Sequence, residues 1–428
     1  MNRVCVGIAG FGTVGRATAE IISAHADLIA QRSGVRLEVT AVCRRSAVKA
    51  EDIPAGARVF SDWNQLVASG DVDVTVETMG GTDEARQLVM ASLKKGKPVV
   101  TANKNLVATH GDELFALAAS QNLPIGFEAS VAGGIPILRV IHESTAGDRL
   151  RAVHGILNGT SNYILTQMES RGIEFELALA EAQKAGYAEA DPTFDIDGFD
   201  ARDKLCILAR MAFGGRLKVS MIPTYGIRHV RAIDVHSANR LDCTIRLVGS
   251  AENTESGIEI SVRPWMVSRR SMLAKVEGVN NAIFLVGDKI GMQMFYGRGA
   301  GGDATGAAVV SDLIEIARDV AAGQISAKKV SGFLDSHDLA ICENPRPVSW
   351  YLRLTVKDQR GIVARVAEAI ARHEINIDSL EQEPHLPKDR VSFVITVEAV
   401  SEPTIRAAVD AINSFEFMVE PVLLLRIE

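Results

Sequence analysis

The stretch Val4-Cys5-Val6-Gly7-Ile8-Ala9-Gly10-Phe11-Gly12-Thr13-Val14-Gly15 decides the fold of the first part of the chain. An apolar strand runs directly into the pattern G-x-G-x-x-G, which opens an amphipathic helix that we predict over residues 13–31. In this context the first glycine permits a tight turn, the second lets a diphosphate approach the backbone, and the third lets helix and strand pack closely. The amide groups at the helix start then attract the diphosphate. The predicted dinucleotide site consists of Gly10, Phe11, Gly12, Thr13, Val14 and Gly15.

Further along the first part of the chain, short β-branched runs alternate with amphipathic segments. The runs are LEVTAVC (37–43), DVTVETM (73–79) and PVVTA (98–102), and their alternation with helices predicts a Rossmann-type parallel sheet in an α/β fold. Arg44 and Arg45 follow the second run, where an acidic residue would hold the ribose hydroxyls of NAD. Arginine pairs instead with a 2′-phosphate, which favours NADP, although a solvated basic pair is nearly as good an interpretation.

Two further regions differ in pattern from the first. Beyond residue 128 a glycine-rich turn, helical segments at 174–185 and 201–212 and later strands predict a mixed α/β domain. After the Pro345-Arg346-Pro347 cluster, the order β-α-β-β-α-β predicts an antiparallel sheet backed by two helices, with helices over 362–373 and 402–413. The predicted division is therefore a dinucleotide-binding domain at 1–127, a catalytic and dimerisation domain at 128–320, a linker at 321–348 and a last domain at 349–428.

Composition excludes several classes of protein. The chain has 428 residues, 47% of them hydrophobic and 23% charged, as in ordinary globular proteins. Its net charge of −7, without long runs of one sign, argues against nucleic acid as a partner. There is no apolar run of about 18 residues and no signal-peptide pattern, so we expect a cytoplasmic protein without membrane insertion. The cysteines are scattered and no histidine pair has ligand spacing, so we expect no transition metal.

Residues 186–204, GYAEADPTFDIDGFDARDK, hold the densest chemistry. A calcium loop of the EF-hand type fails because its last position would be Lys204, where a bidentate glutamate is needed. Asp200 and Lys204 are four residues apart at the start of an apolar helix and therefore share one helical face. A lysine among hydrophobic neighbours is partly desolvated, which makes it usable as a proton carrier.

Six motifs together resemble those of homoserine dehydrogenase, and they follow in the family's order. They are GFGTVG (10–15), TANK (101–104), EASVAGGIPIL (128–138), LNGTSNYIL (157–165), GYAEADPTFDIDGFDARDKLCILA (186–209) and GRGAGGDATGAAVVSDL (297–313). The last domain resembles an ACT regulatory domain. The resemblance implies reversible oxidation of L-homoserine to L-aspartate 4-semialdehyde with NADP or NAD, on the route to threonine, isoleucine and methionine.

The resemblance also implies roles for individual residues. Lys204 matches the family's catalytic proton donor and acceptor, and Lys104 matches its second active-site lysine, which also lies beside the cofactor. Glu189 and Asp200 match the carboxylates that hold the amino-acid substrate. The implied sodium ligands, mostly backbone carbonyls, are Glu128, Val131, Gly133 and Ile135, although this loop reads equally well as a plain turn. Further implied cofactor contacts are Gly186, Gly301 and Gly302. Ala304 departs from the family pattern, which has proline there, so the rigidity of this glycine-rich segment is uncertain.

In the ACT-like region, Gly361 lies in a turn between a strand and a helix, and Asn376 lies on the facing strand edge. ACT domains usually pair edge to edge and bind a small amino acid between protomers. The resemblance therefore implies a homodimer or homotetramer that threonine inhibits, although a domain that only dimerises the protein fits the same pattern.

Two other functions compete with this interpretation. An acylating aldehyde dehydrogenase would need an activated cysteine nucleophile, but Cys206 lies in an apolar helical segment and the other cysteines lie mainly in strand-like runs. A non-enzymatic amino-acid sensor would keep the nucleotide fold for its structure alone. Removal of Lys204 distinguishes the sensor from the enzyme.

Overall fold

The computed structural model describes residues 2–45, 50–382 and 389–428, and these form two compact units. Unit 1 is drawn from Met1–Leu157, Asp200–Ile222 and Asn280–Leu339. Unit 2 is drawn from Asn158–Phe199, Pro223–Val279 and Ala340–Glu428. Among the described residues, no helix combines the length and the apolar character that crossing a bilayer requires.

The core of unit 1 is a six-stranded sheet in which every neighbouring pair is parallel, in the order β3-β2-β1-β4-β5-β6. This confirms the predicted Rossmann-type sheet. Strands β4 and β5 are buried from end to end because helices cover both faces. The strands are β1 (Asn2–Ala9), β2 (Val35–Cys43), β3 (Arg58–Phe60), β4 (Val74–Glu77), β5 (Val99–Thr101) and β6 (Ile125–Gly126).

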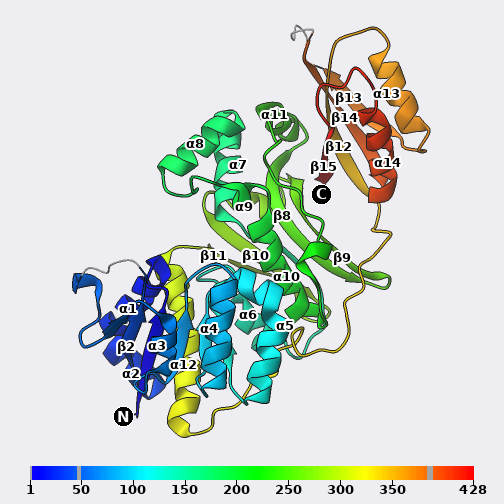
Figure 1. Cartoon of the computed structure of the whole chain (residues 1–428). Helices are drawn as coiled ribbons and strands as arrows, with labels where there is room; N and C mark the ends of the chain where they lie inside the picture. Colours follow the sequence, from blue (N-terminus) through cyan, green and yellow to red (C-terminus); the bar gives the residue numbers. More distant parts are fainter. Residues whose placement is uncertain (1, 46–49, 383–388) are drawn as a thin grey trace. The chain divides into compact units, whose positions relative to one another are not determined.

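Helices α1 (Thr13–Ala24), α2 (Ala26–Ser33) and α12 (Gly302–Ala322) share one apolar core with the sheet, and Figure 1 shows α12 in yellow beside its blue strands. The predicted single helix over 13–31 was wrong, because the backbone of His25, at φ −109° and ψ 18°, leaves the helical region between α1 and α2. No glycine or proline marks this break, and the apolar periodicity continues across it. The other helices of this sheet are α3 (Trp63–Ala68), α4 (Asp83–Lys94) and α5 (Lys104–Ser120).

The rest of unit 1 carries a second, antiparallel group of strands. Strand β10 (Asn280–Gly287) pairs with β7 (Leu150–Ile156) on one side and with β11 (Gly291–Arg298) on the other. Helix α10 (Phe199–Phe213) contributes the apolar segment that follows the acidic motif. The remaining short elements are η1 (Ala50–Asp52), η2 (Glu128–Ser130), α6 (Ile137–Arg139), the π-helical turn η3 (Val140–Ser144) and η4 (Val219–Met221).

Unit 2 begins with helices and continues into a long hairpin. Strands β8 (Cys243–Thr254) and β9 (Gly257–Ser268) are antiparallel along their whole length. The other elements are α7 (Gly159–Arg171), α8 (Phe175–Lys184), α9 (Thr193–Ile196), α11 (Ala232–Arg240) and η5 (Leu273–Lys275). Helices α8 and α10 confirm the helical segments predicted at 174–185 and 201–212.

The C-terminal part of unit 2 has the predicted order β-α-β-β-α-β and its own apolar core. Its strands are antiparallel in the order β15-β12-β14-β13, and β15 also pairs in parallel with β9 through Arg426 and Trp265. The elements are β12 (Val348–Val356), α13 (Ile362–Ala371), β13 (Ile377–Gln382), β14 (Val391–Val400), α14 (Glu402–Asn413) and β15 (Leu423–Ile427).

A buried polar cluster links β12 to the start of α11 within unit 2. The Asp234 carboxylate accepts hydrogen bonds from the Tyr351 hydroxyl and the Arg353 guanidinium, each at 2.8 Å. Arg353 also donates to Glu420 at 2.7 Å and to the His229 carbonyl at 2.7 Å. Because Asp234 and Arg353 are almost fully buried, removal of either partner would leave an uncompensated charge. This cluster therefore fixes α11 against the C-terminal sheet.

Candidate functional site

Two glycines of the first loop, Gly10 and Gly15, are required by their surroundings. Gly10 has φ +96°, and a Cβ atom there would lie 2.3 Å from the carbonyl carbon of Thr78. A Cβ atom at Gly15 would lie 2.3 Å from the Gly10 carbonyl oxygen, whereas one at Gly12 would have no atom within 4 Å. The space above Gly12 is thus open, at the N-terminus of α1, where a diphosphate was predicted to approach.

The start of α12 lies against the start of α1, so the structure brings two separate predicted cofactor segments together. A Cβ atom at Gly302 would lie 3.2 Å from Thr13 Cγ2, and one at Gly306 would lie 3.0 Å from the Thr18 amide nitrogen. Gly301 precedes the helix at φ +112°, in the region that favours glycine. The glycine-rich segment at 299–302 therefore borders the open space above Gly12.

The two arginines after β2 differ in their surroundings. Arg45 is largely exposed and pairs with Glu84 in the first turn of α4. Arg44 is half-buried, and its backbone amide donates to the Phe60 carbonyl at 3.0 Å. Within the described residues its guanidinium has no ion-pair partner, so of the two it is the more available for a phosphate.

Glu77, at the end of β4, is a residue that the sequence analysis did not single out. Its carboxylate accepts hydrogen bonds from the Met79 amide at 2.8 Å and from the Thr101 hydroxyl at 2.5 Å. Burial raises the pKa of Glu77, while these donors oppose the shift. The side chain links the tips of β4 and β5 and so fixes the segments that follow them, including Lys104.

The predicted lysines meet at one carboxylate. Lys204 Nζ lies 2.7 Å from Asp200 Oδ2, which confirms that these residues share one face of α10. Lys104 Nζ, at the start of α5, lies 2.9 Å from Asp200 Oδ1. The side chain of Lys204 is 9% exposed and that of Lys104 is 32% exposed. Asp200 therefore holds two ammonium groups beside each other, one buried and one open to solvent.

A backbone carbonyl completes the surroundings of Lys204. Its Nζ donates to the oxygen of Leu157 at 2.8 Å, just beyond the end of β7. Because an ammonium group has three donors and the described residues occupy two, one N–H direction remains for another acceptor. Leu157 was missed by the sequence analysis because a carbonyl function leaves no residue-type signal.

The loop that contains the predicted sodium ligands is held from both sides. The Glu128 carboxylate accepts from the amides of Leu138 and Arg139 at 2.9 and 2.8 Å, and the Glu128 amide donates to Asp312 at 2.9 Å. Burial and the neighbouring Glu128 raise the pKa of Asp312 to about 7. The Glu128 carboxylate is thus used inside the protein, and only its carbonyl is a candidate ligand.

The four predicted carbonyl ligands differ in what they already bind. The oxygen of Glu128 accepts from the Val131 amide at 3.3 Å, and that of Ile135 accepts from the Ile137 amide at 2.8 Å. Within the described residues, the oxygens of Val131 and Gly133 accept no backbone hydrogen bond. Neutral oxygens in a bent loop suit a monovalent hard cation, so the loop fits sodium. No group of three His, Cys, Asp or Glu side chains suited to a metal occurs among the residues described.

The part of the acidic segment 186–204 that belongs to unit 2 is tied to the start of α7. Asn158 caps this helix by accepting from the Ser161 amide at 2.7 Å, and its amide donates to Asp195 at 2.7 Å. The Thr160 hydroxyl donates to the Tyr187 carbonyl at 2.8 Å. Gly186 has φ +76°, and Glu189 is exposed three residues later. The fold thus holds the motif's backbone in place and leaves the Glu189 side chain at the surface.

In the C-terminal domain, Gly361 starts α13 with φ +86° and lines a cavity of about 150 Å³. Asp358, Gln359 and Phe393 line the same cavity. Asn376 lies outside this lining, and its amide donates to Glu398 at 3.1 Å. The two predicted regulatory residues therefore do not share a pocket within one chain, and the predicted edge-to-edge pairing of two chains stays a prediction.

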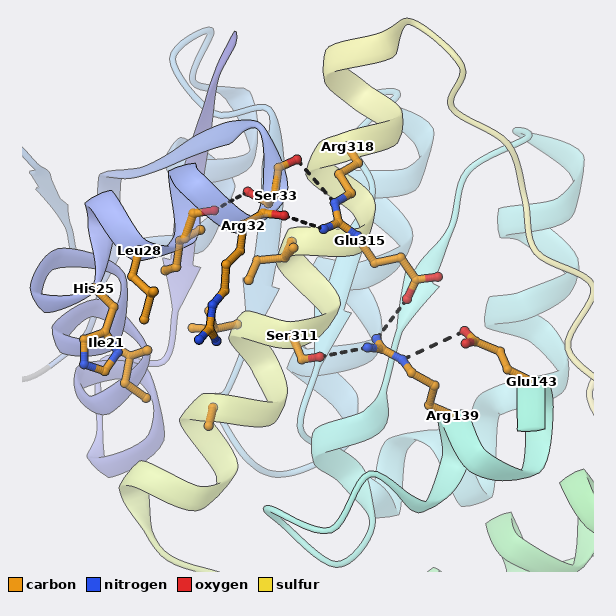
Figure 2. Close-up of a pocket in the computed structure, with 14 residues that line it drawn as sticks. Ile21, His25, Leu28, Arg32, Ser33, Arg139, Glu143, Ser311, Glu315 and Arg318 are labelled. Atoms are coloured by element: carbon orange, nitrogen blue, oxygen red, sulfur yellow. Dashed lines mark hydrogen bonds and ion pairs between the residues drawn. The ribbon is translucent and has the colours of Figure 1, made fainter. Parts of the chain in front are cut away.

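A larger cavity, of about 520 Å³, contains none of the predicted site residues. Figure 2 shows Arg139 reaching Ser311 and Glu315 on α12, each at 2.9 Å, and Arg318 reaching the backbone at the end of α2. Apolar side chains such as Ile21 and Leu28 form the opposite wall. Two of the three arginines that line this cavity, Arg139 and Arg318, thus already bind protein groups.

Comparisons with known proteins agree along the whole chain. The family models described as "Homoserine dehydrogenase, NAD binding domain", "Homoserine dehydrogenase" and "ACT domain" match residues 10–128, 136–314 and 350–417. The homoserine dehydrogenase of Neisseria gonorrhoeae is 38% identical over 431 residues, which is 100% of this chain and 99% of that protein. That of Pseudomonas aeruginosa is 38% identical over 436 residues, with the same coverage of each chain.

Solved structures give the same result. The crystal structure of a homoserine dehydrogenase from Thiobacillus denitrificans has a TM-score of 0.91 at 36% identity, covering 100% of this chain and 99% of that one. A hyperthermophilic archaeal homoserine dehydrogenase in complex with NADPH has a TM-score of 0.62 at 31% identity, covering 73% of this chain and 97% of that one.

The cysteine-nucleophile alternative can be tested at Cys206. This residue is fully buried in α10, and burial raises the pKa of its thiol to about 12, so the thiolate is scarce at neutral pH. We expect Cys206→Ala to keep kcat within about threefold of wild type, and iodoacetamide at pH 7 to leave the activity of the native enzyme unchanged, as measured by nicotinamide absorbance. A loss of about 10²-fold in the variant would favour a covalent mechanism.

Proposed function

The chain belongs to the homoserine dehydrogenase family of oxidoreductases, and we propose that it catalyses the reversible oxidation of L-homoserine to L-aspartate 4-semialdehyde. The observation that carries the proposal is the pairing of Lys204 and Lys104 with opposite oxygens of Asp200. A bound nicotinamide cofactor supplies the hydride acceptor. The residues of the chain must then bind a zwitterion, orient its hydroxyl group and move one proton.

Lys204 is suited to the proton transfer. Its Nζ is held at 2.8 Å from the Leu157 oxygen and 2.7 Å from Asp200, and its remaining N–H direction is available for the substrate hydroxyl. In the oxidation the amine accepts the hydroxyl proton, and in the reduction the ammonium returns it. We assign to Lys104 the stabilisation of the developing alkoxide charge. Glu189 and Asp200 supply negative charge for the substrate ammonium group.

The finer features of the proposal rest on the same resemblance. We infer that NADP binds at residues 10–15 with Arg44 at its 2′-phosphate, that Gly186 and residues 301–302 contact it, and that sodium binds the loop at 128–135. The product is used in the synthesis of threonine, isoleucine and methionine. The enzyme forms a homodimer or homotetramer, and its ACT domain binds threonine. We also propose the domain division at residues 127, 320 and 348. It separates dinucleotide binding, catalysis with dimerisation, and regulation, with a linker before the regulatory domain.

Replacement of Lys204 tests the proposal most directly. We expect Lys204→Ala to lower NADP-dependent homoserine oxidation by about 10² to 10⁴-fold, because proton transfer by a side chain contributes that much. The matched control is Lys218→Ala, an exposed lysine of the same unit, which should leave kcat unchanged. Activity of Lys204→Ala within about tenfold of wild type would show that the lysine is misassigned and would favour the sensor alternative.

The two arginines after β2 allow a paired test of cofactor preference. We expect Arg44→Ser to raise the KM for NADP by about 10-fold or more and to leave that for NAD unchanged, because a charge-assisted bond to phosphate is lost. Arg45→Ser is the control, since Arg45 already pairs with Glu84. Equal changes for NADP and NAD in the Arg44 variant would contradict recognition of the 2′-phosphate.

Regulation can be tested at Gly361. We expect threonine to inhibit the wild type and Gly361→Leu to lose this inhibition at unchanged basal kcat, because the new side chain enters the cavity of about 150 Å³ beside α13. Gly172→Leu is the control, since Gly172 likewise flanks a helix of unit 2, at its C-terminal end, with positive φ and open space around it. Equal inhibition of the wild type and Gly361→Leu would exclude the ACT domain as the sensor and leave it a dimerisation domain.

A further inference from the structure

Asn281 shares an acceptor with Lys204. Its side-chain amide nitrogen donates to the Leu157 oxygen at 2.8 Å, the same distance at which Lys204 Nζ binds that oxygen. All three residues belong to unit 1, on β10, α10 and the end of β7. A carbonyl oxygen has two lone pairs, so these two donors fill its accepting capacity. The plane of the peptide after Leu157 is therefore fixed by two donors, the lysine and the asparagine amide.

The surroundings of Asn281 determine which way its amide points. The residue is fully buried, and its Oδ1 accepts no hydrogen bond in the described part of the chain. Rotating the amide by 180° would place Oδ1 against the Leu157 oxygen and leave the NH₂ group without an acceptor, so the observed orientation is the favourable one. An unpartnered buried oxygen destabilises the folded state, because it has lost its hydrogen bonds to water. An apolar side chain of the same size would avoid that cost, so packing alone does not explain an asparagine here.

The same amide also contacts the segment that leads to the cofactor site. A Cβ atom at Gly299 would lie only 2.0 to 2.3 Å from the amide carbon, nitrogen and oxygen of Asn281, so the Gly299 backbone rests directly on this group. Residues 301–302 follow at once and begin α12. The Asn281 side chain thus lies next to two features. One is the Leu157 carbonyl, which binds Lys204, and the other is the segment 299–302, which lies beside the dinucleotide loop.

We propose that Asn281 is a positioning residue for the reaction, which fixes Lys204 through the carbonyl of Leu157 and sets its distance from the glycine-rich segment at 299–302. This proposal rests on the proposed role of Lys204. Asn281 itself contacts neither substrate nor cofactor. It acts by preventing the carbonyl from turning away, so that the ammonium group keeps one direction for the substrate hydroxyl.

The discriminating variant is Asn281→Leu, which keeps the number and branching of the side-chain heavy atoms but removes both the donor and the unpartnered oxygen. We expect kcat for homoserine oxidation to fall about 10- to 100-fold, because small displacements of a catalytic group cost that much. The KM values for homoserine and cofactor should stay within about threefold, and the melting temperature should be unchanged or higher. A kcat within threefold of wild type would overturn the proposal.

Thr75→Val is the matched control, because Thr75 is another fully buried residue of unit 1 whose side-chain oxygen has no partner among the described residues. It should alter the melting temperature without altering kcat. A comparable loss of kcat in Thr75→Val would show that the effect of Asn281→Leu is a general consequence of core substitution, and would overturn the assignment.

A double-mutant cycle separates this proposal from the one on which it rests. If Asn281 acts through Lys204, Asn281→Leu lowers kcat in the wild type but not further in Lys204→Ala. Additive losses of kcat in the double variant would show that Asn281 does not act through Lys204 and would overturn the proposal. If Lys204→Ala itself retains activity, the assignment of the lysine fails first.

Should Asn281→Leu not fold, Asn281→Ala serves the same purpose. It also removes the donor to the Leu157 oxygen and adds no bulk against Gly299, so kcat should fall while the melting temperature falls because a cavity is left. An unchanged kcat in this variant would overturn the proposal as well.

Discussion

The placement of Asp200 between two lysines is the constraint on which the site depends. Two ammonium groups that share one carboxylate repel each other, and the repulsion is stronger where solvent is excluded. Their approach therefore requires a carboxylate that accepts from both, one on each oxygen. Lys104 has a second disadvantage, because it stands at the N-terminus of α5, where the helix dipole disfavours positive charge. Asp200 offsets both effects and thereby ties the tip of the parallel sheet to α10.

The backbone carbonyl of Leu157 extends this arrangement toward the second group of strands. It lies at the end of β7, which is paired with β10, so the antiparallel strands determine where the acceptor for Lys204 stands. The side-chain position of the lysine thus depends on strand register as well as on its own helix. A one-residue slip of β10 against β7 would turn Asn281 to the other face of the strands and remove the amide from the carbonyl.

The sequence predicted those features that local rules decide. The glycine pattern between strand and helix predicted the loop, and the spacing of four residues predicted that Asp200 and Lys204 share a helical face. Prediction from the sequence failed where the residues in contact lie far apart in the chain or where no residue type signals the feature. The break at His25 has no glycine or proline, and Asn281 lies 124 residues from Leu157 in the chain. The pairing of β15 with β9 joins strands of unit 2 that lie far apart in the chain, and it has no local pattern. Glu77 looked like an ordinary residue in an apolar strand, because burial and its two hydrogen bonds are tertiary properties.

At position 304, where the resemblance predicts proline, this chain has alanine, and close packing restrains the segment instead. Alanine there keeps a backbone N–H, and because the first helical bond of α12 runs from the Thr305 amide to the Gly301 carbonyl, the Ala304 amide is one of the unsatisfied donors at the helix start. A proline would remove that donor but fix the backbone angle. In this chain the close contacts of Gly302 with Thr13 and of Gly306 with Thr18 restrain the segment instead. Helix α12 is thus held against α1 by glycine packing, and the free amide adds a donor on the side where an anionic group of the cofactor is expected to lie.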